Sequence, residues 1–140
     1  MHQIIFVGAR ELVLEMEADD SPADNFPCMA SPFFRDARAQ LYALITGCFF
    51  DDALALEELC HQLTEDGPFI YQLDFHIQDQ LARLEEDEII EIAALWQACE
   101  EVESMDMETS DIAEFLFQFV HFCYTANADE ELSVFFFGDS

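Results

Sequence analysis

Uncompensated negative charge constrains this chain more than any other feature of its sequence. The 140 residues include 31 Asp and Glu against 4 basic residues, which gives a formal net charge of −27. There is no lysine, and the four basic residues are Arg10, Arg35, Arg38 and Arg83. Repulsion among so many carboxylates opposes a compact state. Folding therefore requires a large apolar core, which 52% hydrophobic residues can supply. We predict that residues 1–140 form a single acidic globular domain.

The same charge excess restricts the kind of partner. A charge magnitude of about 2–8 is enough to keep a small domain soluble. A negative field repels nucleic acids and anionic lipids and attracts basic proteins. We therefore predict a basic protein partner and no direct binding to nucleic acid or membrane. Adaptation to high salt would also favour acids over lysine. High salt strengthens apolar burial, however, so a salt-adapted chain is expected to carry fewer large apolar residues than the 15 Phe found here.

Apolar segments near both ends of the chain predict strands. Residues 3–7 are β-branched and aromatic, Gly8-Ala9 can form a tight turn, and residues 11–17 alternate between apolar and acidic side chains. This pattern predicts an N-terminal hairpin with one solvent-exposed face. The apolar residues 133–137 predict a further strand that pairs with the hairpin.

Helical spacing of apolar residues predicts about five helices between these strands. Ser31-Pro32 favours a helix start and Gly47 a helix end. Residues 18–32 resemble a loop, and residues 69–77 fit a strand as well as a helix. The fold class is therefore α+β, with the helices packed on a small antiparallel sheet. The predicted helices span 32–45, 51–66, 69–84, 86–103 and 111–125.

A long run of carboxylates lies in residues 85–111, which hold 11 acids and no basic residue. Residues three or four apart on a helix lie about 5–6 Å apart at Cβ, which is similar in order to the spacing of phosphates along a strand. A helical face could therefore imitate a phosphate track. Glu100, Glu101 and Glu103 would lie at the C-terminal end of helix 86–103, where the helix dipole disfavours anions, which indicates a functional reason. The predicted partner-binding residues are Glu85, Glu86, Asp87, Glu88, Glu91, Glu100, Glu101, Glu103, Asp106 and Glu108.

The common sequence motifs of catalytic and metal-binding sites are missing. Phosphate-binding glycine loops, nucleophile elbows and H-E-x-x-H are absent, and Cys60-His61 and His121-x-Cys123 lack the spacing of a strong zinc site. Glu57-Glu58 and Glu85-Glu86 do not complete the EExxE pattern of helical nucleotide pyrophosphatases. We predict no catalytic residue, no metal, no cofactor and no enzymatic activity. His121 is expected on a polar stripe with a partner in the core.

The predicted location is the cytoplasm. The first residues lack the charged region and long apolar run of a secretory leader. The apolar stretch 112–124 is too short to cross a bilayer. Five scattered cysteines fit free thiols in a reducing compartment.

In size and charge, though in no motif, the chain resembles phage anti-restriction and anti-CRISPR proteins. This resemblance implies a non-enzymatic inhibitor that binds the basic nucleic-acid-binding surface of a partner as a DNA or RNA mimic. An immunity protein that neutralises a nuclease toxin fits size and acidity equally well, and would depend on one aromatic or Asp hot spot. An acidic secretion chaperone or adaptor would need an exposed apolar groove or dimer face. The sequence leaves monomer and homodimer both open.

Overall fold

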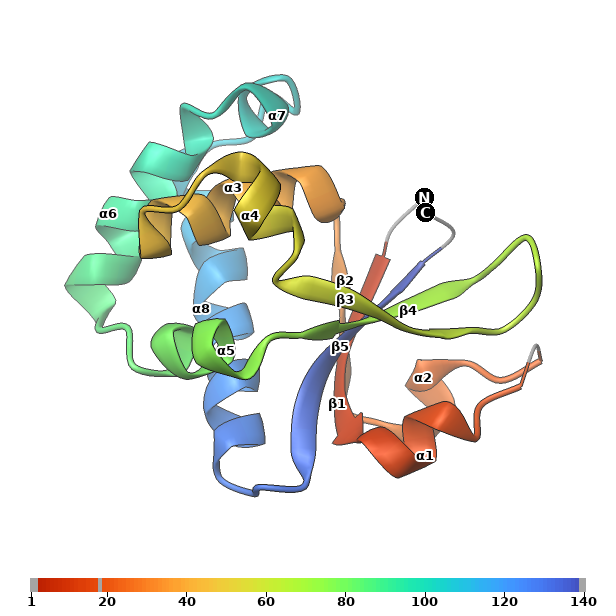
Figure 1. Cartoon of the computed structure of the whole chain (residues 1–140). Helices are drawn as coiled ribbons and strands as arrows, with labels where there is room; N and C mark the ends of the chain where they lie inside the picture. Colours follow the sequence, from red (N-terminus) through yellow and green to blue (C-terminus); the bar gives the residue numbers. More distant parts are fainter. Residues whose placement is uncertain (1–2, 18, 139–140) are drawn as a thin grey trace.

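The structure is a computed structural model that describes residues 3–17 and 19–138, and its fold class is α+β as predicted (Figure 1). In these residues, eight helices pack on a five-stranded antiparallel sheet. The strands are β1 (Gln3–Ala9), β2 (Cys28–Ser31), β3 (Glu57–Gln62), β4 (Phe69–Leu73) and β5 (Leu132–Gly138). The helices are α1 (Arg10–Leu14), α2 (Pro22–Asn25), α3 (Arg35–Thr46), α4 (Phe50–Leu54), α5 (Phe75–Ala82), α6 (Glu86–Gln97), α7 (Glu100–Glu103) and α8 (Thr109–Asn127).

The first and last strands lie side by side in the middle of the sheet, whose order is β2-β1-β5-β4-β3. The predicted pairing of the C-terminal strand with the N-terminal one is confirmed, in the register Ile4↔Phe137 to Ala9↔Leu132. Both faces of these central strands are covered. Ile5 and Phe136 pack among the helices, while Phe6 and Phe135 pack on the opposite face. Continuous apolar runs in β1 and β5 are explained by this burial on both faces.

Helices α3, α5 and α8 lie on one face of the sheet, α6 packs on the outside of α3 and α8, and α1 and α2 lie on the other face (Figure 1). Trp96 anchors α6 in the larger core. Its ring centroid is 4.4 Å from that of Phe33, and its Nε1–H donates a hydrogen bond to the Ala37 carbonyl oxygen at 2.8 Å. These contacts join α6 to α3, so the opposite side of α6 faces solvent.

The predicted second strand of the N-terminal hairpin, residues 11–17, is wrong. The turn predicted at Gly8-Ala9 does not form, because β1 continues through both residues and α1 begins at Arg10. A Cβ at Gly8 would lie 2.6 Å from the ring of Phe26, so this glycine allows close packing on the strand. Val13 and Met16 are buried, which is the i, i+3 spacing of a helix.

Three predicted helices also need correction. Residues 51–66 form only the short α4 and then β3, and residues 69–84 form β4 before α5, because these two strands complete the sheet by pairing with each other. The apolar residues Leu56, Leu59, Cys60 and Leu63 have helical spacing, but Leu56 and Leu63 flank β3, and Leu59 is 49% exposed. Helix 86–103 is interrupted after Gln97.

Smaller differences concern the ends of elements. The predicted loop 18–32 contains α2 and β2, within the part of it that the structure describes. Ser31 belongs to β2 and caps no helix, and its hydroxyl accepts the Phe33 N–H at 3.1 Å. Helix α3 ends at Gly47 as predicted, with φ of 76° in the left-handed region. The predicted helix 111–125 is confirmed as α8, although it begins at Thr109 and its N-cap is Glu108 instead of Asp111.

A buried ion pair joins α3 to β3. The Arg38 guanidinium donates to both carboxylate oxygens of Glu57, each at 2.7 Å, and both side chains are 1% exposed. The Tyr42 hydroxyl also donates to Glu57. Burial lowers the pKa of Arg38, but the charge and hydrogen bonds of Glu57, together with Tyr42, more than offset this, and the pKa is raised. Burial, together with Glu57, raises the pKa of Tyr42 well above its usual value, so the hydroxyl keeps its proton.

The same guanidinium reaches the centre of the sheet. It lies 4.2 Å from the ring centroid of Phe136 in β5, and it donates to the side chain of Gln3 in β1. It also donates to the Phe33 carbonyl oxygen at 2.8 Å. From its place in α3, Arg38 therefore contacts the segment before that helix and three strands of the sheet.

Replacing Glu57 with Gln should destabilise the fold strongly, because it leaves the Arg38 charge buried without a counter-ion. The expected loss is about 3–5 kcal/mol in free energy of unfolding, measured by urea titration. Asp79→Asn is the control, since it removes an ion pair with Arg83 whose side chain is 77% exposed. The control should cost about 1 kcal/mol or less. Equal losses for the two variants would contradict the role given to Arg38.

Candidate acidic interface around helices α6 and α7

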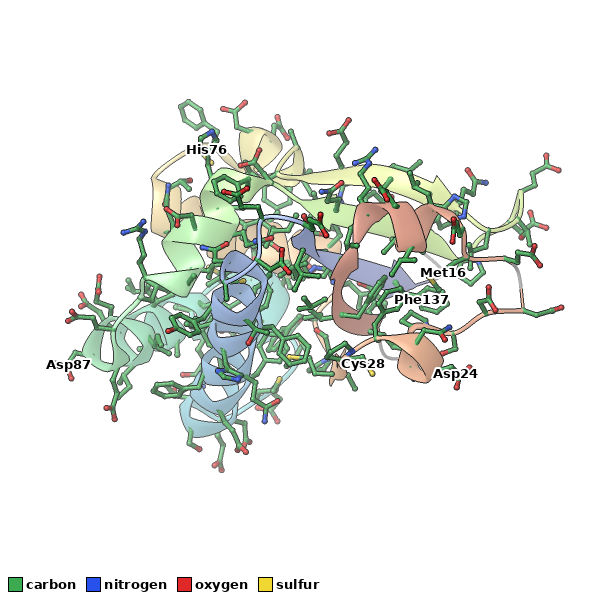
Figure 2. All side chains as sticks on the ribbon, turned by 90° about the horizontal axis from the view of Figure 1, so that it is seen from below. Met16, Asp24, Cys28, His76, Asp87 and Phe137 are labelled. Atoms are coloured by element: carbon green, nitrogen blue, oxygen red, sulfur yellow. The ribbon has the colours of Figure 1, made fainter. Side chains whose placement is uncertain are left out.

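All ten predicted partner-binding carboxylates are exposed, and they fall into two groups, one in and just before the first half of α6 and one after its end. We call the two together the acidic interface. Asp87, in the first group, projects into solvent at one end of the molecule (Figure 2). The α6-start group consists of Glu85, Glu86, Asp87, Glu88 and Glu91. The α7 group consists of Glu100, Glu101, Glu103, Asp106 and Glu108.

Most of these carboxylates lie at helix N-termini. Glu85 is the N-cap of α6, and its backbone N–H donates to Glu88 Oε1 at 3.2 Å. Glu100, Glu101 and Glu103 form the first turn of α7, because α6 ends before them. The prediction that these three residues occupy the unfavourable end of a helix is therefore wrong. The helix dipole favours anions at an N-terminus, so local structure lowers the cost of this charge.

Side-chain contacts of Gln97 hold the α7 group against α6. The Gln97 amide donates to the Met107 carbonyl oxygen at 2.8 Å and accepts from the Thr109 hydroxyl. Val102 is fully buried and anchors α7 in the core. The segment between α6 and α8 is thereby fixed at both ends, so its carboxylates have defined positions.

No arginine neutralises the acidic interface in residues 3–17 and 19–138. The ion pairs there are Arg38–Glu57 and Arg83–Asp79. Arg35 donates to two backbone carbonyl oxygens, and Arg10 donates to the side chain of Gln72. All four cations are thus engaged elsewhere, and the ten carboxylates face solvent with their charge uncompensated.

The acids do not form one continuous track. Helix α6 has 12 residues, and after Glu91, half-way along it, no further acid occurs before Glu100. The exposed face of α6 carries apolar residues around and beyond Glu91. Its residues have the spacing i, i+3, i+4, i+7, i+8, i+11, and every one is exposed. We call this face the α6 outer stripe; it consists of Asp87, Ile90, Glu91, Ala94, Leu95 and Ala98.

Two hollows border α7. One, of about 460 Å³, lies between α3 and α7 and is lined by Phe34, Asp36, Glu101 and Met105, among others. The second, of about 370 Å³, continues the α6 outer stripe. Its lining combines carboxylates with apolar groups and comprises Ala94, Gln97, Ala98, Glu103, Asp106 and Met107. Each hollow therefore offers two carboxylates beside apolar surface, which suits a side chain with an aliphatic stem and a cationic head.

Sequence reasoning missed part of this surface. Asp36 in the first hollow comes from a distant helix, so only the fold brings it to α7. The helical spacing of Ile90, Ala94 and Leu95 is visible in the sequence. The sequence alone does not show that these residues lie on the exposed side of the helix, because a buried side would have apolar residues at the same spacing.

Carboxylates also occur far from the acidic interface. Asp24 lies at the opposite end of the molecule from Asp87 (Figure 2). Exposed acids follow α1, occupy the tip of the β3–β4 hairpin and follow α8. The acidic interface is distinguished by the number of its carboxylates and by the absence of arginine from the whole stretch 84–108.

Residues singled out for metal chemistry do not converge. Within the described part of the chain, no three His, Cys, Asp or Glu side chains are placed to hold a metal ion. The His61 ring lies 2.9 Å from the Met16 carbonyl oxygen, and Cys123 is buried. His121 is exposed on α8, so its predicted core partner is wrong, because the stripe that it shares with Gln118 faces solvent.

In residues 3–17 and 19–138, no helix has both the length and the hydropathy that spanning a bilayer requires. Comparison of the chain with protein-family models, with curated proteins and with solved structures gives no match. The function is therefore inferred from the residues of this chain and their geometry.

Glu88→Ala should destabilise the protein by about 0.5–1 kcal/mol, because it removes the carboxylate that accepts the backbone N–H of the N-cap residue Glu85. Glu91→Ala removes an equal charge one turn later and should change stability by less than about 0.5 kcal/mol. Urea unfolding of the two variants measures the difference. Equal stabilities would show that the acids at the start of α6 do not support the helix.

Proposed function

We propose that this chain is a non-enzymatic binding protein that covers the basic nucleic-acid-binding surface of another protein. One observation carries the proposal: ten exposed carboxylates, none paired with an arginine in the described residues, lie along the first half of a well-anchored helix and beyond its end. Such a surface attracts Arg and Lys side chains that would otherwise contact phosphates.

We propose that the protein competes with nucleic acid for the cationic groove of its partner. A partner that presents Arg and Lys along a groove meets carboxylates in place of phosphates, and nucleic acid is then both displaced and repelled. Long-range attraction speeds the encounter, and salt weakens it, since the screening length is about 10 Å at 0.1 M ionic strength. The five cysteines are free thiols, which supports action in a reducing compartment such as the cytoplasm.

An immunity protein for a nuclease toxin is the second candidate. The observation that favours it is the exposed apolar surface of Ile90 and Leu95, because tight complexes of this kind depend on hot-spot side chains as well as charge. Both candidates place a basic nucleic-acid-binding or nuclease surface on the acidic interface. They differ in the biological role of the partner.

The proposal is tested with two variants of equal net charge. The interface variant carries Glu86→Gln, Glu91→Gln, Glu100→Gln, Glu101→Gln and Glu103→Gln. The matched control neutralises five exposed acids elsewhere, with Glu11→Gln, Glu15→Gln, Asp24→Asn, Glu65→Gln and Asp66→Asn. Each protein is used to capture partners from a lysate of its own source cells at low salt, and bound proteins are displaced with a short DNA or RNA duplex.

The unmodified protein and the control should capture the same nucleic-acid-binding protein, and the duplex should release it. The interface variant should bind the purified partner at least about fivefold more weakly, since five charge contacts are each worth about 0.2–1 kcal/mol. Equal weakening of both variants would contradict the proposal, because attraction would then depend on total charge and not on this surface. Capture of no basic protein by any form would contradict it as well.

A further inference from the structure

The α6 outer stripe combines apolar and acidic side chains in an order that a simple phosphate mimic does not need. Ile90 is 49% exposed and Leu95 is 51% exposed, and Ala94 lies between them on the same face. Exposed apolar residues are ordinary when they are scattered. Here they are contiguous along one helix, on the side opposite the buried Trp96.

Acidic residues lie at both ends of this apolar strip and also within it. Most of the α6-start group lies at one end and the α7 group at the other, while Glu91 lies between Ile90 and Leu95 on the same face. The hollow beyond Ala94 and Ala98 is bordered by Glu103 and Asp106. This arrangement combines apolar contacts with surrounding carboxylates, as protein interfaces do.

The dimensions fit a helix. Small residues at Ala94 and Ala98 let a second helix approach closely, and packed helices lie about 8–10 Å apart depending on such side chains. A partner helix of three or four turns that lies along α6 would place its ends near the two acidic groups. Only cationic ends are complementary, because the rim carries no arginine in the described residues.

We infer that the α6 outer stripe is the docking face for a basic amphipathic helix of the partner's nucleic-acid-binding surface. This inference rests on the proposed function and makes it more specific. Apolar side chains of the partner helix contact Ile90, Ala94 and Leu95, while its Arg and Lys side chains reach the two acidic groups. Helices of this kind are recognised by apolar anchors at i, i+3, i+4 and i+7. Such helices also enter the major groove of DNA.

The groove between Phe75 and Tyr124 is a weaker candidate. It is lined by Arg83 and Asp79, which pair with each other, so its charge indicates no particular occupant.

Two synthetic peptides of about 18 residues, about 27 Å long as helices, provide the probes. Both have one composition of Lys, Leu and Ala. In the first, the order gives an amphipathic helix with lysine at both ends, and in the second the order is scrambled so that no apolar face forms. Binding to the full chain is measured by fluorescence anisotropy at physiological salt, and peptide helicity by circular dichroism.

Two double variants locate the site. Ile90→Ser with Leu95→Ser removes the apolar centre without a change in charge. Leu12→Ser with Leu14→Ser is the matched control, because these leucines of α1 are 56% and 42% exposed and also have acidic neighbours. Both variants alter exposed positions, and unchanged urea midpoints confirm that the fold is kept.

The amphipathic peptide should bind at least about tenfold more tightly than the scrambled one and become helical, and the Ile90/Leu95 variant should remove that preference. The Leu12/Leu14 variant should bind like the unmodified protein. Equal binding of the two peptides would overturn the inference and leave the proposed function standing on charge alone. A preference that survives the Ile90/Leu95 variant, or that both variants abolish, would also overturn it. If neither peptide binds, the inference fails, and the proposed function fails with it only if the capture experiment finds no basic partner.

Discussion

The buried ion pair between Arg38 and Glu57 is the interaction on which the rest of this structure depends. It joins α3 to the edge strand β3, and through Gln3 and Phe136 it reaches the two central strands. A charged pair in a core is stable only when its geometry is good and its remaining polar atoms are bonded. Here a bidentate contact, a tyrosine hydroxyl and a backbone carbonyl meet that condition. Among the described acids, Glu57 alone is buried.

This use of arginine has a direct effect on the surface. Arg38 is buried, and half-buried Arg35 donates to backbone carbonyl oxygens and lies 4.7 Å from the ring centroid of Tyr71. Two of four cations are therefore used in the interior, and the carboxylates outside remain uncompensated. Aromatic packing opposes the resulting repulsion, with rings of Phe33, Trp96 and Phe115 in mutual contact. The placement of acids at helix N-termini lowers the cost of this repulsion further.

Local patterns predicted the parts of the fold that depend on neighbours in the chain. The end of α3 at Gly47, helix α8 and the apolar strands β1 and β5 follow from turn chemistry and hydrophobic runs. The strands β3 and β4 could not be predicted in this way, since their state is decided by pairing with each other and by the distant partner of Glu57. Period-two alternation in residues 11–17 was misleading because the two exposed leucines imitate a buried face.

The candidate site was likewise only partly predictable from the sequence. Exposure of the ten carboxylates was predictable, because unpaired acids are rarely buried. Their division into two groups was not, because it depends on the break after Gln97 that the contacts of Thr109 and Met107 stabilise. The apolar centre between the groups then changes the expected partner from a bare row of cations to a surface with apolar anchors.

Amide hydrogen exchange of the complex with a purified basic protein recovered by capture tests the central claim most directly. Contact with the acidic interface predicts slower exchange in α6 and in residues 98–108, with little change in α1, α2 or the β3–β4 hairpin. Protection centred on those other elements, or spread evenly over the chain, would contradict the account.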